Sequence, residues 1–323
     1  MKLGLMIVRI AVLLFAAFNF GTAFAQYPTR PVKILVPIPP GGAPDIVARV
    51  IAHKLADLLG QPMVVENRAG SNGNIAGDLA AKSPADGYTL MLGQDSIFVV
   101  NPHLYAKMPF NPLTDLIPVA SVAANQFFLS VNPAVPVKNF QEFVEYARRA
   151  SPPLAYASGG SGSLSHLSME ILKVRAGINL VHVPYKGGAP ATTATVAGET
   201  PVTFAGASSA AQIKAGRLRA LAATASVRTP AFPDLPSIGE FYPGYDVRTW
   251  HALFSPAGTP DSVLARLRAA VSTALGQPDV KESLNAAGGM EPYATRIEDF
   301  TVLIRRDFER FGKVIKDVNV SLD

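Results

Sequence analysis

Residues 32–45 read VKILVPIPPGGAPD, which is a short apolar strand, a turn rich in proline and glycine, and the start of a helix. The apolar residues of 45–59 then recur with the 3.6-residue period of a helix that buries one face. Further strands at 63–66 and 88–92, with a helix at 75–82, continue the alternation. This order predicts an α/β fold in which a mainly parallel sheet is covered by helices on both faces.

The rest of the chain repeats this alternation and predicts a second lobe. An extended apolar segment at 118–131 is the expected crossing from the first lobe, and the proline-rich stretch 229–236 is the expected return. A chain of 323 residues is also long for one hydrophobic core. We therefore predict a discontinuous lobe 1 at 26–125 and 226–323, and lobe 2 at 126–225. Helices after the first crossing are expected at 140–150, 164–176, 191–197, 210–215, 260–275, 279–286 and 297–318.

The composition excludes several classes of protein. With 49% hydrophobic and 16% charged residues, the chain has ample apolar material for a packed core, which excludes a disordered chain. It has no cysteine, which excludes disulfides, thiolate zinc sites and cysteine nucleophiles. The histidines form no metal-binding pattern, so we expect neither a metal nor a cofactor. The 29 basic residues exceed the 24 acidic ones only slightly and form no stripe, so no nucleic-acid partner is expected.

The first 25 residues have the pattern of a signal peptide. Lys2 and Arg9 give a positive start, residues 3–20 are mostly apolar, and Ala23-Phe24-Ala25 fits the small-x-small cleavage pattern. We therefore predict export to the periplasm and cleavage after Ala25. A retained N-terminal membrane anchor is the alternative, because the apolar stretch is nearly long enough to span a bilayer.

Two loops share one physical design, because each follows a strand, contains Gly-Gly and opens a helix. They read PPGGAPD at 39–45 and VPYKGGAP at 183–190. A helix start has up to four unpaired N–H donors and a partial positive charge, and glycine lets a ligand approach the main chain. Pro44 and Pro190 suit the first helical turn, where a missing N–H costs least. Either loop alone is typical of a tight turn, whereas the pair facing one cleft would hold a carboxylate from both sides.

A third turn, SGGSGS at 158–163, precedes the helix that carries His166. Its serines are ordinary capping residues, or one of them donates a hydrogen bond to a ligand. A hydrolase that uses Ser161, Ser163 or Ser165 with His166 is a third interpretation. The residues around Ser161 fail the G-x-S-x-G pattern at its last position, and no acidic partner is evident, which disfavours that interpretation.

Several short blocks, in order along the chain, resemble the Bug family of solute receptors, the substrate-binding components of tripartite tricarboxylate transporters. The blocks are YPTRPV at 27–32, GQPMVVENR at 60–68, PADGYTL at 84–90, HVPYKG at 182–187, IKAGRLRAL at 213–221, and Trp250 with PAGTP at 256–260. The resemblance implies a periplasmic binding protein with two lobes of the type II-like, Venus-flytrap kind. It also implies a monomeric receptor without enzymatic activity, which binds a small carboxylate solute and delivers it to membrane permease subunits.

The resemblance further implies that one ligand carboxylate is held between the two loops, by main-chain N–H groups and ordered water. The implied ligand-binding residues are Pro40, Gly41, Gly42, Ala43 and Asp45 in the first loop, Gly187, Gly188, Ala189 and Pro190 in the second, and Ser158, Ser163 and His166 on the wall. Asp45 has an alternative role, since an acidic residue in the first turn stabilises the helix start.

The chain also departs from the family pattern. Pro44 stands where the family often has threonine or serine, and Pro201 and Ala205 stand where acidic residues are usual. The missing acidic residues disfavour a ligand amino group, so we expect a plain carboxylate, with aromatic, di- and tricarboxylates all compatible. The segment 94–98 also differs, which indicates that the far side of the pocket is individual. A periplasmic sensor subunit that presents the loaded form to a signalling partner is the alternative function.

Overall fold

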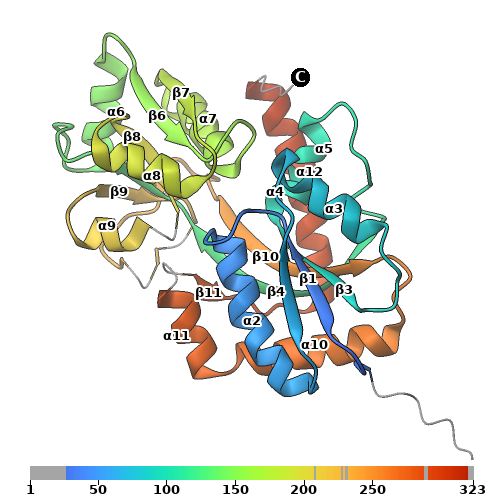
Figure 1. The fold of residues 1–323 in the computed structure, drawn as a ribbon. Coiled ribbons are helices and arrows are strands. Elements are labelled where there is room, and N and C mark those ends of the chain that lie inside the picture. Colours follow the sequence, from blue (N-terminus) through green and yellow to red (C-terminus); the bar gives the residue numbers. More distant parts are fainter. Residues whose placement is uncertain (1–26, 207–208, 227, 230–231, 287–289, 319–323) are drawn as a thin grey trace, which may run out of the picture.

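The computed structural model describes residues 27–206, 209–226, 228–229, 232–286 and 290–318, and the predicted signal peptide at 1–25 lies outside them. Two β-sheets organise the described residues into two lobes (Figure 1). The first sheet has six strands in the order β11-β4-β10-β3-β1-β2, and the second has five in the order β7-β6-β8-β5-β9. The predicted α/β class and two-lobed architecture are confirmed.

The first sheet contains a parallel part and an antiparallel part. Its parallel strands are β1 (Val32–Val36), β2 (Met63–Asn67) and β3 (Thr89–Gln94). Its antiparallel strands are β4 (Leu116–Gln126), β10 (Arg248–Pro256) and β11 (Glu291–Pro292). The sheet is therefore mixed rather than mainly parallel. Strand β10 lies between β3 and β4 and is antiparallel to both, so β4 runs in the direction of β1, β2 and β3, while β10 and β11 run against it.

The second sheet is also mixed. Strands β6 (Leu154–Ser158), β7 (Leu180–Pro184) and β8 (Val202–Ala205) are parallel. Strand β5 (Phe128–Val131) is antiparallel to both β8 and β9 (Arg219–Ala223).

Helices cover both sheets. Those of lobe 1 are α2 (Ala43–Leu59), α3 (Asn74–Ala81), α4 (Asp95–Val99), α5 (Asn101–Leu104), α10 (Asp261–Leu275), α11 (Pro278–Ala286) and α12 (Ile297–Val318), with the 3₁₀ turn η1 (Ser71–Gly73). Those of lobe 2 are α6 (Phe140–Arg149), α7 (Leu164–Ala176), α8 (Gly188–Ala197) and α9 (Ala210–Lys214). No described helix is both long and apolar enough to cross a bilayer.

The alternation of β1 explains how it sits between helical layers. Val32, Ile34 and Val36 belong to the apolar cluster that includes α2 and α10, and each is 0% exposed. Leu35 points to the other face and belongs to a second apolar cluster, which contains residues of α12 and of lobe 2. Because a strand turns successive side chains to opposite faces, the four apolar residues of β1 are buried on both faces, and only Lys33 near its start is exposed.

The chain crosses between the lobes twice. Strand β4 leads into β5 through Phe127, and the return segment 224–247 leads into β10. Two contacts keep described parts of that segment on lobe 2. Ser237, in the turn that opens η3 (Ile238–Glu240), forms a β-bridge with Ala223 of β9. The Tyr245 hydroxyl donates to the Ser168 carbonyl at 2.8 Å. The chain therefore returns to lobe 1 after residues 229–236, where it enters β10. The lobe boundaries at 125/126 and 225/226 stay predictions.

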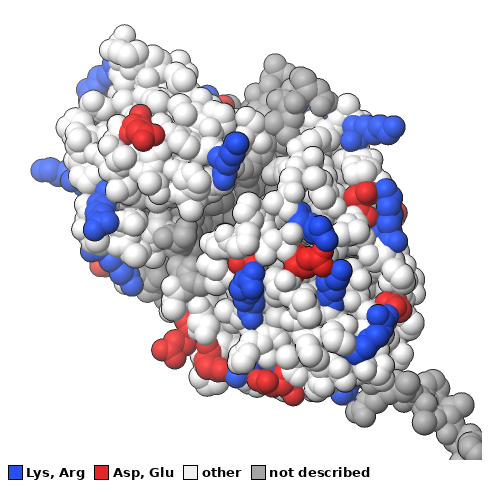
Figure 2. Space-filling model, viewed as in Figure 1, with Lys and Arg blue, Asp and Glu red and all other residues white. Residues whose placement is uncertain are grey.

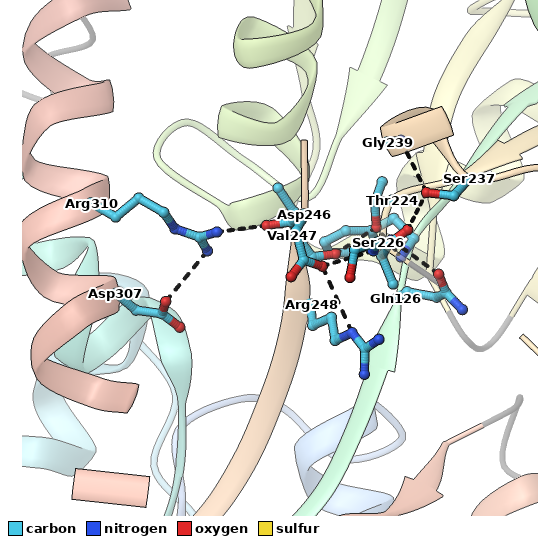
Figure 3. A network of polar contacts seen from close by, with 12 residues as sticks. Gln126, Thr224, Ser226, Ser237, Gly239, Asp246, Val247, Arg248, Asp307 and Arg310 are labelled. Carbon is cyan, nitrogen blue, oxygen red and sulfur yellow. Dashed lines mark hydrogen bonds and ion pairs between the residues drawn. The ribbon is translucent and has the colours of Figure 1, made fainter. Parts of the chain in front are cut away.

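Helix α12 ties the return segment to lobe 1. It packs against α4 and β4 of lobe 1 and also against α7 of lobe 2. Figure 3 shows Arg310 of α12 reaching the return segment, where its Nη1 donates to the Asp246 carbonyl at 2.6 Å. Arg310 also lies 3.5 Å from the Asp307 carboxylate. The last helix of the chain thus contacts both lobes.

Candidate functional site

The two glycine-rich loops lie at the carboxyl ends of strands in different lobes. The first follows β1 and opens α2, and the second follows β7 and opens α8. Figure 1 places α2 and α8 on facing sides of the space between the lobes, and Figure 2 shows the surface hollowed there. Open α/β sheets bind ligands at this edge, beyond the carboxyl ends of their strands.

The first loop is anchored by a buried carboxylate. Asp45 is 2% exposed, and its oxygens accept from the Gly41 amide at 2.9 Å, Arg49 Nε at 3.0 Å and Asn67 Nδ2 at 2.9 Å. Asn67 Nδ2 also donates to the Ile38 carbonyl at 3.0 Å. Burial acts to raise the pKa of Asp45, but these hydrogen bonds hold that pKa below its usual value. Asp45 is therefore an ionised anchor whose oxygens already have partners.

Both helix starts leave main-chain donors free. The first main-chain bond of α2 runs from the Ile46 amide to the Gly42 carbonyl at 3.1 Å, and that of α8 from Ala191 to Gly187 at 3.4 Å. The preceding amides have no intrahelical partner. No hydrogen bond among the described residues takes up the Ala43 or Asp45 amide in α2, or the Gly188 or Ala189 amide in α8. Each helix start therefore presents two donors, with a proline between or directly after them.

The residues at these two starts are accessible. Pro40 and Gly41 are exposed, while Gly42 and Ala43 are half-buried. In the second loop Gly188, Ala189 and Pro190 are exposed and Gly187 is half-buried. A ligand can therefore reach the main chain of the second loop at residues 188–190 and that of the first loop at residues 40–43, whereas Pro44 and Asp45 are buried.

The third turn is joined directly to the second loop. The Tyr185 amide donates to the Ser158 carbonyl at 3.0 Å, and the Gly187 amide donates to the Gly159 carbonyl at 3.2 Å. A Cβ at Gly159 would lie only 3.3 Å from the Gly188 nitrogen, so the two main chains are in contact. The structure thus brings the second and third loops together as one unit.

The predicted wall residues Ser158, Ser163 and His166 have protein partners. Ser163 caps α7, because its Oγ accepts from the His166 amide at 3.3 Å. Ser158 is 0% exposed, and its Oγ lies 2.6 Å from His182 Nε2. His166 is 6% exposed, and its Nδ1 accepts from the Gly162 amide at 3.1 Å.

Sequence reasoning missed the partner of His166. The His166 and His182 rings stack with centroids 3.9 Å apart and an interplanar angle of 10°. Burial and the neighbouring His182 lower the pKa of His166 to about 4, against the opposing effect of Glu170, and burial also lowers the pKa of His182. The pairing of β6 with β7 sets His182 beside Tyr156, and a prediction of this strand pairing could have revealed the stack of the two histidines.

This arrangement orders loops and does not form a nucleophile. The serine hydroxyl that reaches an imidazole belongs to Ser158, which is fully buried. The Nδ1 atom of His166 is occupied by a main-chain N–H instead of a hydroxyl. A hydrolytic nucleophile needs an accessible hydroxyl bonded to its base, so this turn does not have that geometry. Within the described residues, no group of three or more potential ligands is placed to hold a metal ion.

Two cavities lie away from these loops. One of about 520 Å³ is lined by residues of α9, β9 and the return segment, including Ile213, Arg219 and Phe232. The other, of about 50 Å³, lies between β10 and α12 beside Trp250 and Asp307. Trp250 is 2% exposed and packs edge-on against a ring of α12 with centroids 5.0 Å apart, so it fills the core.

Comparison with known proteins agrees with this architecture. The model of the tripartite tricarboxylate transporter family receptor matches residues 47–320. Protein BugT of Bordetella pertussis is 34% identical over 299 residues, which cover 92% of this chain and 91% of that protein. An R. palustris structure with adipate has a TM-score of 0.84 at 34% identity, covering 91% of this chain and 99% of that one. MatC from Rhodopseudomonas palustris with bound malate has a TM-score of 0.80 at 32% identity, covering 90% of this chain and 100% of that one.

Proposed function

This chain belongs to the family of tripartite tricarboxylate transporter receptors, as its Bug-like sequence blocks predicted, and we propose that it binds a small carboxylate solute between its lobes. The observation that carries the proposal is the pair of helix starts, each with two amides that have no partner among the described residues; Gly188 and Ala189 are exposed, Ala43 is half-buried and Asp45 is buried. The proposed contacts are the Ala43 and Asp45 amides from α2 and the Gly188 and Ala189 amides from α8.

The number of donors matches the chemistry of one carboxylate. An ionised carboxylate has about four lone-pair sites, so four amides can complete its hydrogen bonding. At roughly 1.5 kcal/mol for each charge-assisted bond, four bonds supply about 6 kcal/mol. Micromolar affinity requires about 8 kcal/mol, and apolar burial on closure can supply the remainder.

The ligands of two solved relatives and two positions of this sequence support the choice of solute class. The solved relatives hold adipate and malate, which are dicarboxylates without an amino group. Pro201 and Ala205 offer no acidic group to a ligand amine, and Ala205 is buried. We therefore propose plain carboxylates over amino acids, with delivery from the periplasm to the permease subunits of a tripartite transporter.

A melting screen tests the proposal. The mature protein is titrated with adipate, malate, aspartate and adipamide, the last of which keeps the chain of adipate but has no carboxylate. We expect adipate or malate to raise the melting temperature by mass action, and adipamide to leave it unchanged. A shift with adipamide equal to that with adipate, or no shift with any carboxylate in a wider panel, contradicts the proposal.

A further inference from the structure

The stacked histidines lie directly beneath the loops and have defined hydrogen-bonding roles. A main-chain N–H only donates, so the Nδ1 atom of His166 that accepts from Gly162 carries no proton. The remaining proton of the neutral ring is then on Nε2, which lies 4.0 Å from Glu170 Oε1. The second ring, His182, lies with its Nε2 against the hydroxyl of Ser158.

Hydrogen bonds and the main chain of the third turn connect these rings to the second loop. Ser158 Oγ accepts from the Gly160 amide at 3.1 Å, and Ser165 Oγ accepts from the Gly159 amide at 3.0 Å. The Gly159 carbonyl in turn accepts from the Gly187 amide. Gly187 directly precedes the free Gly188 amide, whose nitrogen is in contact with Gly159. The main chain of the third turn therefore holds the second loop in position.

We propose that His166 and His182 are positioning residues, which hold the third turn so that the Gly188 and Ala189 amides point to the solute carboxylate. This inference rests on the proposed function, since it assigns those amides to the ligand. It gives the histidines a role through the main chain, in place of a contact with the solute.

The role requires the His166 imidazole to stay neutral. A proton on His166 Nδ1 would face the Gly162 N–H and remove that anchor. The ionisable groups near the rings are Glu170 and Lys173 of α7, which are paired at 2.8 Å, and Tyr156 of β6, which donates to Glu170 at 2.6 Å. Strand β8 and helix α8, which pack on this unit, have no ionisable side chain.

Helix α12 also packs on α7, and its described charged residues lie on exposed positions or, as Arg310 and Asp307 do, beside each other. Burial of the imidazoles, more than any one charge, thus keeps the rings neutral.

Paired variants of His166 test the proposal. His166→Asn places an amide oxygen near the position of Nδ1 and can still accept from Gly162, whereas His166→Leu cannot. The readout is calorimetric affinity for whichever of adipate and malate binds the unaltered protein. We expect His166→Leu to weaken binding at least tenfold and His166→Asn to stay within about threefold. Equal affinities of His166→Leu and the unaltered protein, or an equal loss in both variants, overturn the proposal.

The pH profile supplies a readout that a purely structural role would not move. The carboxylates of the solute titrate in the same range, so the readout is the ratio of the dissociation constant of the unaltered protein to that of His166→Asn, in which protonation of the solute cancels. With a His166 pKa of about 4, this ratio should be flat above pH 5.5, then double by pH 4 and rise about fourfold by pH 3.5. The exposed His53→Asn control on α2 should show the same rise relative to His166→Asn. A profile of His166→Asn identical to that of the unaltered protein overturns the proposal.

A nuclear magnetic resonance experiment separates this inference from the proposed function. If no carboxylate of the wider panel binds, the proposed function fails, and the positioning role is judged from the amide signals of Gly162 and Gly188. Both signals should shift with the titration of His166, and neither should titrate in His166→Asn. A Gly188 signal that ignores the titration overturns the positioning role, whether or not a solute binds. This measurement also decides the case in which His166→Leu fails to fold.

Discussion

Gly188→Leu is the sharpest test of the paired helix starts, because the structure leaves room for a side chain at this position. A Cβ at Gly188 meets nothing within 4 Å, and its φ lies outside the positive range that restricts Gly187 and Gly41. The Cβ of the new side chain therefore meets no clash, and the backbone conformation is one that leucine adopts without strain. Replacing a glycine in a helix also stabilises the fold by up to about 1 kcal/mol.

The expected loss is in solute binding. The new side chain would cover the Gly188 and Ala189 amides, which are exposed at the start of α8. Losing two charge-assisted hydrogen bonds of about 1.5 kcal/mol each removes about 3 kcal/mol, which is roughly a 150-fold increase in the dissociation constant. Isothermal titration calorimetry with adipate and malate measures this change, and a melting curve without solute verifies that the variant is folded.

Ala197→Leu is the matched control, because it adds the same side chain at the exposed opposite end of the same helix. We expect this variant to keep the affinity of the unaltered protein. If folded Gly188→Leu binds the solute as well as Ala197→Leu does, the second loop is not the carboxylate site and the reasoning is refuted.

Three further substitutions test the packing of the site and the pH dependence of the stability of the fold. Gly159→Ala places a Cβ 3.3 Å from the Gly188 nitrogen, so we expect it to weaken solute binding about tenfold in calorimetry while the melting temperature falls only slightly. Burial raises the pKa of Asp95 to about 7, so between about pH 4 and 7 the folded state binds more protons than the unfolded state, and the free energy of unfolding falls as pH rises through this range. Asp95→Asn should flatten this dependence. In urea denaturation at pH 8 it should add about 2 kcal/mol to the free energy of unfolding. The ring nitrogens of buried His251 have no partner among the described residues, and burial lowers the pKa of His251 to about 4, so stability is lost as pH falls from about 6.5. His251→Leu should therefore raise the melting temperature, most strongly near pH 5. An unchanged or lower melting temperature contradicts this account.

Local patterns predicted the elements of the fold well. The helices expected at 164–176 and 297–318 agree with α7 (Leu164–Ala176) and α12 (Ile297–Val318). The strand expected at 63–66 is one residue longer in β2. Periodicity reports which face of an element is buried, and these elements each bury one or both faces continuously. It does not report which strands pair, so the antiparallel insertion of β10 between β3 and β4 was not predictable from it.

The candidate site was predictable only at the level of the main chain. Gly-Gly before a helix fixed the positions of both loops, because free amides at a helix start depend on backbone geometry alone. The side-chain partners depend on tertiary contacts between distant segments. Asp45 is satisfied by Asn67 of β2, and His166 stacks on His182 of β7. Because of such contacts, the predicted wall residues Ser158, Ser163 and His166 bond to other groups of the protein.

The position of β10 has a consequence for the order in which the molecule is completed during synthesis. All five strands of the second sheet come from 128–223, so that sheet has its full set as soon as this stretch is made. The first sheet, although it begins the chain, is divided until 248–256 arrive to separate and join β3 and β4. The N-terminal half of lobe 1 therefore keeps one edge of β3 unpaired until residues more than a hundred positions later in the chain arrive, and this edge can pair with another chain in the interval.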